Sequence, residues 1–582
     1  MFKKILTKIF NSKTKKEQEQ KQEELFPEPL WRKQAKQMPL KKDLQSNLDT
    51  IHQILGDSQD IIIRKMSVRS THIALVYLEG MVDYAVINDF ILKPIVLESR
   101  QAKPDKDFPP KELYSRLLNH VTPAGEVVEA SDFDQLVFLV LTGIGAVLVD
   151  GQNKAIMVSA KGWPKRAVSE PDIESVIRGP REGFTETLRV NTVLIRRRIR
   201  DPNLRIITTQ IGRRSKTDVA IAYIKGIADP ELVDEVKKRL ETIDIDAIME
   251  SAYVEQLIED NWWSPFPTVQ ETERPDTVAA SLIEGRVAII VDNTPFVLLV
   301  PANINMFMVS PEDAYVKWTA GTFVRFLRFG ANFIAMLLPG IYIALTSFHP
   351  EMLPTGLALS IAATREAVPF PAYMEAFLME LSLELLREAG IRLPGPISQT
   401  IGIVGALVVG TAAVQASLVS PVMVIVVAFT AIAAFSTPTV SFGFAIRQMR
   451  FMYMILATFL GLYGMMLGLL VLLGHFACLK SFGMGYLEPF APLSTGDLKD
   501  VMLRLPLPYN AHTGRRLLRT PMMSAGWKTE GRTIYREGWT ATAMKANRPF
   551  PDTNICCGNC YLCRLCQQGG NRRPFNRARV LQ

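Results

Sequence analysis

In this 582-residue chain, four glutamates interrupt a largely apolar stretch. The stretch begins at Pro369 and reads PFPAYMEAFLMELSLELLREAG. On a helix, Glu380, Glu384 and Glu388 recur at four-residue spacing and therefore share one face, while Glu375 lies just off that stripe. Carboxylates at bilayer depth are costly, and they usually face the interior of a helix bundle or water. The stripe is therefore the candidate functional site of this sequence.

Two interpretations of the stripe stay open. In the first, the helix lines a cation pathway, with a ring of carboxylates if several chains assemble. In the second, the helix lies at the membrane interface, with its acids in water and with Arg387 and Arg392 as their partners. Gln415, a polar residue in a later glycine-rich apolar run, joins the four glutamates as a candidate for pore lining or gating.

The elements that must position these side chains are apolar runs, because a helix needs about 20 mostly apolar residues to span a bilayer. The four clearest runs are Phe329–Phe348, Ile397–Val419, Pro421–Ile446 and Phe451–Ala477. The third is interrupted at Ser436-Thr437-Pro438, and Arg447 and Arg450 separate it from the last. An all-α multi-pass transmembrane domain is therefore expected over residues 318–480.

The number of spans depends on the glutamate helix. If this helix crosses the bilayer there are five spans and the tail lies outside; if it does not, there are four and the basic tail lies inside. Its carboxylates favour four spans plus one interfacial or re-entrant helix. The first span is preceded by three basic residues, Lys317, Arg325 and Arg328. Because positive charge is enriched on the cytoplasmic side of spans, this favours a cytoplasmic location for the soluble head that comes before it.

The sequence pattern of residues 40–317 predicts a soluble α/β domain, here called the head. Leu40–Leu55 has leucine and isoleucine at three- and four-residue spacing, which indicates an amphipathic helix. Two strand-like segments align with each other, IALVYLEGMVD from Ile73 and VAIAYIKGIAD from Val219. The alignment matches Tyr77 with Tyr223, Gly80 with Gly226 and Asp83 with Asp229.

A second pair of segments supports the repeat. VLVDGQNKAIMV from Val147 resembles IIVDNTPFVLLV from Ile289, and each reads as a β-hairpin with turn residues between two apolar strands. We therefore expect two related α/β subdomains, at about 65–160 and 215–302, each with the order strand, helix, hairpin.

Between these repeats, Ser169–Arg200 alternates acidic residues with arginines. Arg178, Arg181, Glu182 and Glu186 could form an ion-pair lattice at a domain or subunit interface. They could also bind an anionic ligand, because arginine makes bidentate contacts with carboxylates. A solvated helix face with salt bridges is the third interpretation.

The net charge of +8 is concentrated at the two ends of the chain. Residues 1–39 form a basic, flexible N-terminal segment whose start, Met1–Phe10, has the pattern of a short amphipathic helix. Basic ends beside a membrane block indicate contact with anionic lipid or the cytoplasm, and no nucleic-acid-binding motif is present. Nucleic acid is therefore not an expected partner.

No catalytic constellation emerges from the sequence, so an enzyme is not expected. The six histidines include no pair with metal-ligand spacing on one helix. No phosphate-binding loop, nucleophile elbow or dinucleotide fingerprint is present.

Five of the six cysteines fall in the tail, residues 481–582. Cys557, Cys560, Cys563 and Cys566 have two residues between neighbours, a pattern typical of zinc or iron–sulfur ligands. No histidine accompanies them, and no second pair lies at the distance of a structural zinc site. We therefore expect no metal and no cofactor, and we favour a tail translated out of frame after about Leu505.

Four long segments resemble one known family. They are GPREGFTETLRVNTVLIRRRI from Gly179, SPFPTVQETERPDTVAASLIEGRVAIIVD from Ser264, ELLREAGIRLP from Glu384 and VGALVVGTAAVQASLVSPVMVIV from Val404. The chain resembles the A subunit of the nutrient germinant receptors of bacterial endospores, the GerA type, over roughly residues 40–505. After about Leu505 the family pattern ends.

The resemblance implies a non-enzymatic, multi-pass receptor subunit in the spore inner membrane, where small nutrients trigger germination and ion release. It implies a transporter-like B subunit and a lipoprotein C subunit as partners, and a homo-oligomer that forms the ion-conducting path. Two alternatives stay open: a secondary transporter that works alone, which inverted repeats of broken helices would favour, and a metal- or redox-sensing membrane protein that uses the cysteine-rich tail.

Overall fold

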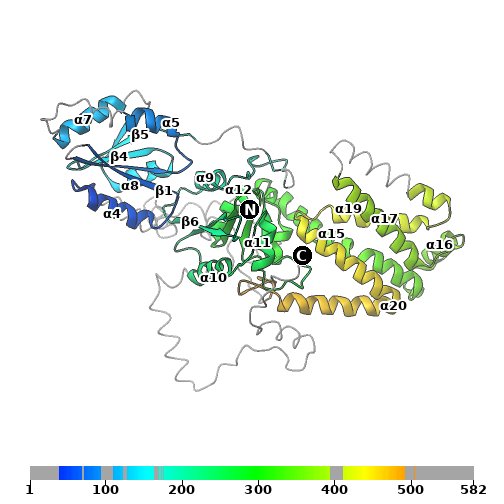
Figure 1. The fold of residues 1–582 in the computed structure, drawn as a ribbon. Helices are drawn as coiled ribbons and strands as arrows, with labels where there is room; N and C mark the ends of the chain where they lie inside the picture. Colours follow the sequence, from blue (N-terminus) through cyan, green and yellow to red (C-terminus); the bar gives the residue numbers. More distant parts are fainter. Residues whose placement is uncertain are drawn as a thin grey trace, which may run out of the picture.

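The computed structural model describes residues 38–68, 71–93, 109–121, 127–162, 170–171, 174, 176–392, 410–491 and 504. The predicted helix at Met1–Phe10, most of the apolar run Ile397–Val419 and the tail cysteines lie outside these residues. Figure 1 shows the described chain as three parts in a row: a first sheet unit in blue and cyan, a second in green, and a helical base in green-yellow to gold.

The first unit is a five-stranded antiparallel sheet with helices on both faces. Its strands, in sheet order, are β1 (Ile61–Val68), β2 (Thr71–Leu78), β4 (Gly145–Val149), β5 (Ala155–Val158) and β3 (Val127–Ala130). One face is covered by α4 (Leu44–Leu55) and α8 (Phe133–Leu141), and the other by α5 (Tyr84–Val86), the short π-helix η1 (Ile87–Leu92) and α7 (Pro110–Val121).

The central strand β2 is buried on both of its faces. Side chains alternate across a strand, so Ala74 and Val76 contact the layer of α4 and α8, while Ile73 and Leu75 contact the opposite layer. A strand buried on both sides has to be apolar at nearly every position. The run HIALVYL meets that requirement, and the strand predicted there is confirmed.

The second unit repeats this architecture with the same strand order. Its strands are β6 (Leu204–Ile211), β7 (Thr217–Ile224), β9 (Val287–Val291), β10 (Val297–Val300) and β8 (Gln270–Thr272). One face is covered by α10 (Pro230–Glu241) and α11 (Ser251–Ile258), and the other by α9 (Leu188–Arg198) and α12 (Pro275–Glu284).

The equivalence of the units extends to single hydrogen bonds. In the first hairpin, Asp150 Oδ1 accepts the Leu44 N–H that opens α4, at 3.1 Å. In the second, Asp292 Oδ1 accepts the Leu188 N–H that opens α9, at 2.9 Å. Each hairpin turn therefore satisfies a backbone donor that the helix itself leaves free, and α4 and α9 occupy equivalent places.

A buried ion pair joins the two units. Arg196 Nε on α9 donates to Asp60 Oδ2 at 2.7 Å, and Arg196 Nη2 donates to Ser58 Oγ at 2.8 Å. Arg196 is 1% exposed and Asp60 is 5% exposed. The Ser58 hydroxyl also accepts the Ile206 N–H at the start of β6, so the segment before β1 is fixed to the edge of the second sheet.

The second unit passes into the base through α13 (Ile304–Met308) and α14 (Glu312–Tyr315). Asp313 of α14 accepts from Arg328 of the first long helix at 2.8 Å, and both side chains are buried. The chain returns to the same place after the base, where β11 (Lys480–Ser481) pairs with β12 (Met484–Gly485). Ser481 Oγ accepts the Ala302 N–H at 3.0 Å, which ties the end of the base to the second unit.

The base is helical throughout its described length. Its elements are α15 (Trp318–Ser347), the 3₁₀ turn η3 (Pro350–Met352), α16 (Thr355–Arg365), α17 (Ala372–Arg392), α19 (Pro421–Ala434) and α20 (Val440–Cys478). Within the described residues, two helices, α15 and α20, are long and apolar enough to cross a membrane. The predicted order of an α/β part followed by a helical part is therefore confirmed, and the predicted number of spans stays a prediction.

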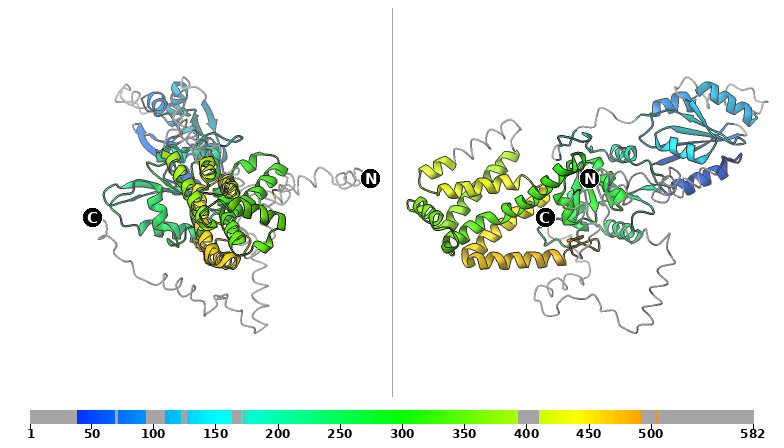
Figure 2. Two further views of the ribbon diagram at one scale, coloured as in Figure 1. Left: turned by 90° about the vertical axis from the view of Figure 1, so that its right-hand side faces the viewer. Right: turned by 180° about the vertical axis from the view of Figure 1, so that it is seen from behind.

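Helix α20 reverses direction at Gly461, whose φ of 59° and ψ of −140° are not helical. A β-carbon on Gly468 would lie 2.6 Å from Leu456 Cδ1 and 3.0 Å from the ring of Tyr453. Leu456 and Gly468 would be about 18 Å apart along a straight helix, so the two halves of α20 fold back on each other. The right-hand view in Figure 2 shows these halves as separate yellow-gold helices that meet at an angle.

This reversal corrects two expectations. The charge-free run Phe451–Ala477 was expected to be one span, and it is divided at Gly461. Arg447 and Arg450 were expected to separate two spans, and they lie instead inside the first half of α20. No charge or proline marks the turn; a glycine allows it, because positive φ is strained for other residues.

Candidate functional site

Helix α17 carries the four candidate glutamates and runs antiparallel to the first half of α20. Its alanine, leucine, methionine and glutamate content favours helix formation. The preceding Pro371 starts it, because its carbonyl accepts the N–H groups of Met374 and Glu375. The helix packs against α15, α19 and α20.

Glu380 is paired with Arg450 in the interior of the base. The two side chains form an ion pair and neither is exposed to solvent, at 0% for each. Arg450 Nε also donates to the carbonyl oxygen of Ala335 on α15 at 2.9 Å. This arginine therefore connects three helices at one depth of the base.

Three buried polar atoms in and beside this ion pair make no hydrogen bond within the described part of the protein. Among the described residues, Glu380 Oε1, Arg450 Nη2 and the Tyr453 hydroxyl are buried without a hydrogen-bond partner in the protein. Each unsatisfied buried polar atom costs free energy. The cluster is therefore held by packing around it, and removal of one partner would leave an isolated charge.

Glu384 lies one turn further along α17 and pairs with Arg447, one turn back along α20. The carboxylate is 3.0 Å from Arg447 Nε and 3.5 Å from Arg387, and 30% of its side chain is exposed. Arg447 also lies over the ring of Phe444, at 4.0 Å from its centre. Together with Glu380 and Arg450, these residues form a ladder of opposite charges between antiparallel helices.

Glu375 lies apart from this ladder. It is fully buried, pairs with Arg365 of α16 at 3.2 Å, and accepts the Ser420 N–H at 2.9 Å. Ser420 is the residue that caps α19. Glu375 therefore fixes the start of α19 against α16 and α17.

The remaining two candidates, Glu388 and Gln415, are both exposed. Glu388 lines a small cavity of about 250 Å³ together with Glu384, Arg387 and Arg447. Gln415 is the last helical residue of the segment that is described from residue 410 onward. The structure thus brings Glu384 and Glu388 to one cavity, and it places Glu375 and Gln415 elsewhere.

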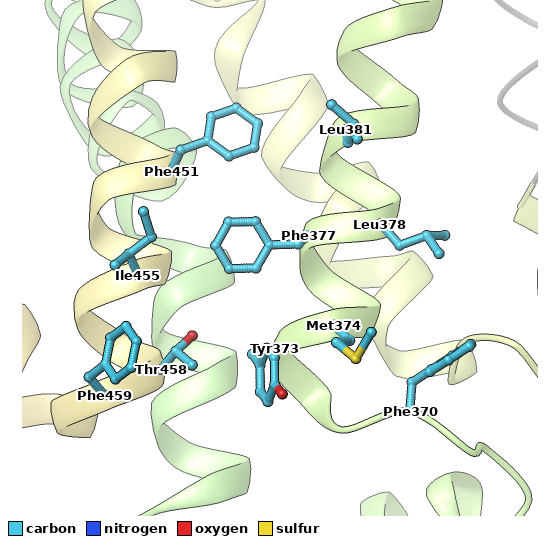
Figure 3. Close-up of a pocket in the computed structure, with 10 residues that line it drawn as sticks. All are labelled: Phe370, Tyr373, Met374, Phe377, Leu378, Leu381, Phe451, Ile455, Thr458 and Phe459. Atoms are coloured by element: carbon cyan, nitrogen blue, oxygen red, sulfur yellow. The ribbon is translucent and has the colours of Figure 1, made fainter.

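A larger apolar groove of about 760 Å³ lies next to the ladder, between α17 and α20. Figure 3 shows its lining, in which Phe377 of α17 points toward Phe451 and Ile455 of α20. The rings of Phe377 and Phe451 are stacked with their centres 6.4 Å apart. The groove is lined almost wholly by apolar atoms, so the polar chemistry of this region is confined to the neighbouring ladder.

The four charged residues between the sheet units do not pair with one another in the described structure. Arg181 pairs with Glu170 at the surface, at 3.2 Å. Glu182 bridges Arg197 and Arg198 at the end of α9, at 3.1 Å to each. Arg178 and Glu186 are exposed. Arg181 and Glu182 thus pair with Glu170 and with α9, and a lattice at a domain or subunit interface stays a prediction.

A group of glutamates in the second unit was not anticipated from the sequence. Burial raises the pKa of the Glu255 carboxyl on α11, and together with the nearby charges of Glu271, Glu259 and Glu250 it brings this pKa to about 8. Burial also raises the pKa of Glu259 to about 7. Glu255 and Glu259 are four residues apart on an amphipathic segment. This spacing is also typical of the solvated face of a helix, so it does not indicate burial.

The described residues contain no group of three or more histidine, cysteine or acidic side chains arranged to hold a metal ion. The candidate ligands Cys557, Cys560, Cys563 and Cys566 lie outside the residues that the structure describes.

Sequence comparison shows which known proteins this chain is similar to. A family model described as Bacillus/Clostridium GerA spore germination protein matches residues 49–515. Spore germination protein KA of Bacillus subtilis (strain 168) is 42% identical over 478 residues, which cover 81% of this chain and 87% of that protein. Spore germination protein B1 of the same strain is 42% identical over 471 residues, which cover 81% of this chain and 96% of that protein.

One solved structure is also similar. The N-terminal domain of the A subunit of the Bacillus megaterium spore germinant receptor GerK3 is 38% identical to this chain. The match covers 45% of this chain and 96% of that domain, with a TM-score of 0.36.

Proposed function

The chain belongs to the GerA family of spore germination proteins, and from this premise we propose that it is the A subunit of a receptor that starts germination when nutrients are present. The proposal divides the chain into a basic N-terminal segment (1–39), a soluble head (40–317), a transmembrane domain (318–480) and a hydrophilic tail (481–582). The family is not a known enzyme family, and the proposed role is that of a receptor rather than a catalyst.

The proposal locates the helical base in the spore inner membrane as a multi-pass domain. It is supported by two helices of sufficient length and apolarity. The outer surface of these helices exposes large apolar side chains, among them Phe326 on α15 and Leu470 on α20. Such a surface is unfavourable in water and suits lipid. Because α20 turns at Gly461, its first half would enter the membrane from the side of the head and its second half would return to that same side.

The observation that carries the proposed mechanism is the charged ladder between α17 and α20. In the proposal, the fully buried Glu375 and Glu380 hold α17 in place, while Glu384 and Glu388 are the carboxylates that cations meet. Ionisable residues inside a membrane domain usually face a water-filled path or each other. An oligomer of this chain would arrange copies of Glu384 and Glu388 around a common path, with Gln415 as a further polar candidate.

The proposal includes a transporter-like B subunit and a lipoprotein C subunit as partners, because members of this receptor class act with other subunits. The alternatives of a transporter that works alone and of a metal or redox sensor receive no support from the relatives found.

The test replaces Glu384 and Glu388 together by glutamine in spores of the source organism. Gln keeps the size and removes the charge that cations would meet, so we expect slower cation release after addition of a complete nutrient mixture. Recovery of the receptor from the inner membrane, measured by immunoblotting, should stay unchanged. Normal release kinetics in the double variant would remove both residues from the path.

A matched control is Glu366→Gln, an acidic residue at the end of α16 that lies away from the ladder. This change should leave cation release unaltered. Equal slowing by the control and the double variant would indicate a general effect of charge loss and would contradict the assignment.

A further inference from the structure

Two adjacent tryptophans of the second unit are unusually exposed. Trp262 is 61% exposed and Trp263 is 77% exposed, and their rings lie 4.5 Å apart. Just before them, α11 exposes Tyr253 and Leu257, which share one face at four-residue spacing. These four side chains, here called the aromatic patch, are large apolar groups that a soluble surface normally covers.

The chain directly after the aromatic patch is attached to the end of the base. Ser264 Oγ lies 2.9 Å from His475 Nε2, and the ring of Phe266 packs edge-on against Phe476, with centres 4.5 Å apart. Both partners belong to the last turns of α20. The patch therefore lies where α20 leaves the base and reaches the second unit.

The second half of α20 is somewhat shorter than the hydrocarbon core of a membrane is thick. His475 lies about 21 Å from the turn at Gly461, because an α-helix rises roughly 1.5 Å per residue. The hydrocarbon core of a bilayer is about 30 Å thick, with headgroup regions outside it. This half of α20 is about 9 Å shorter than the hydrocarbon core, a mismatch that local thinning of the bilayer accommodates. With the turn toward the far interface, Trp262 and Trp263 then lie at the near interface, the depth at which tryptophan is enriched in membrane proteins.

We propose that the aromatic patch is an interfacial anchor, in which Trp262 and Trp263 insert into the headgroup region of the bilayer that surrounds the base. This inference depends on the proposed membrane location of the base. The indole ring suits that depth, since its apolar body can enter the acyl boundary while its N–H reaches the headgroups. The anchor would fix the orientation of the second unit on the membrane surface.

Continuity with the base favours lipid over a protein partner as the occupant. The second half of α20 exposes Leu470 and Leu473, which lie close to His475 on the same helix half. The aromatic patch is thus attached to the end of a helix half whose exposed apolar side chains the proposal already assigns to lipid. A partner protein that covered the patch would have to displace lipid from the adjoining helix.

The test compares the full-length chain with the double variant Trp262→Phe/Trp263→Phe. Each is reconstituted into vesicles of phosphatidylethanolamine and phosphatidylglycerol, with and without phosphatidylcholine brominated near the carbonyl end of its acyl chains. The difference between the two emission spectra reports the tryptophan pair alone. We expect this difference spectrum to be blue-shifted and to lose most of its intensity in brominated vesicles.

A control tryptophan is introduced by Phe138→Trp in the double variant, because Phe138 is 46% exposed on α8 of the first unit, away from the base. Its added emission should resist bromine quenching. A pair that is quenched no more than this control would overturn the anchor. If the double variant does not reconstitute, Trp263→Phe alone gives the same comparison.

A separate measurement distinguishes this inference from the membrane location of the base. Resistance of the reconstituted chain to extraction with alkaline carbonate reports an embedded base. A resistant chain with an unquenched pair overturns the anchor and leaves the membrane location standing. An extractable chain overturns the membrane location and the anchor together.

Discussion

Glu380 on α17 and Arg450 on α20 form an ion pair in which neither side chain is exposed. The pair lies between two antiparallel helices and is extended by Glu384 and Arg447 one turn further on. Two isolated charges at this depth would be strongly unfavourable, but their pairing lets both remain in the base. The position of α17 relative to α20 is therefore fixed by charge as well as by packing.

Replacement of Glu380 by glutamine should destabilise the base. The change leaves Arg450 buried with its charge uncompensated, and removal of one partner of a buried pair typically costs about 3–5 kcal/mol. Thermal unfolding of the chain in detergent should show a clearly lower Tm, together with less receptor in the membrane. The added change Arg450→Met should recover part of the loss, because it removes the unpaired charge.

The exposed Glu388 on the same helix supplies the control for that experiment. Glu388→Gln keeps the helix and the stripe but changes an exposed position, so its free energy of unfolding should stay within about 0.5 kcal/mol of the wild type and its Tm should be nearly unchanged. Equal Tm values for Glu380→Gln and Glu388→Gln would show that the buried pair does not stabilise α17.

Replacement of Arg196 by alanine should loosen the contact between the two sheet units. The change removes three hydrogen bonds to Asp60 and Ser58 and leaves the Asp60 carboxylate buried. We expect a loss of about 3 kcal/mol in the free energy of unfolding, measured by urea denaturation of the chain in detergent.

The exposed pair of Arg213 and Asp244 is the comparison for Arg196. Their atoms lie 2.5 Å apart, but the side chains are 67% and 64% exposed. Water and salt screen such an exposed pair, so it contributes little to stability and Arg213→Ala should have a small effect. A loss of the same size for both variants would contradict a special role for burial.

Much of the fold could be predicted because buried strands leave a strong pattern. The runs that became β2 and β7 are apolar at nearly every position and end in turn residues. The edge strands β1 and β6 escaped prediction, because their outer faces carry residues such as Arg64, Lys65 and Gln210. The short strands β3 and β8 escaped for a different reason, since strands of this length carry no periodic signal.

The glutamates of the site could be predicted from their spacing, but their partners could not. Glu380 and Arg450 meet only because α17 and α20 pack in one particular register, which depends on helices far apart in the chain. Arg447 and Arg450 therefore resembled a polar break between two spans. The reversal at Gly461 was equally hidden, because nearby glycines such as Gly464 and Gly474 lie in the same apolar run without turning it.

The stability of the second unit should fall as the pH rises from about 5 to about 8. The folded pKa of Glu255 is raised from its ordinary value of 4.5 to about 8. Between these values the folded state binds more protons than the unfolded state, so stability is greatest at low pH and is lost on the way up. Thermal unfolding of the chain in detergent at several pH values should show this slope.

Glu255→Gln should flatten that slope, since glutamine does not titrate and fits the same space. Glu241→Gln, an exposed position on α10 of the same unit, should leave the slope as in the wild type. An unchanged slope in Glu255→Gln would assign the pH dependence to other groups.

Replacement of Gly461 by alanine should destabilise the turn in α20. Its φ of 59° is unfavourable for alanine, and the new β-carbon would lie 2.9 Å from the His349 ring and 3.0 Å from Phe348. A strained backbone residue costs about 1–3 kcal/mol, and the Tm in detergent should fall accordingly. Gly474→Ala is the control: it lies in the helix with no atom within 4 Å of the added carbon, so it should be neutral or slightly stabilising.

The turn at Gly461 also predicts on which side of the membrane Cys478 lies. Cys478 is exposed at the end of α20, so it can react with a membrane-impermeant maleimide once the tail cysteines are replaced by serine. Because the two halves of α20 fold back on each other, Cys478 should react from the same side as a Lys238→Cys marker in the head. A Tyr463→Cys marker beside the turn, at a position that is 80% exposed, should react from the opposite side. A straight, spanning α20 predicts the reverse for Cys478, so labelling of sealed vesicles before and after permeabilisation separates the two arrangements.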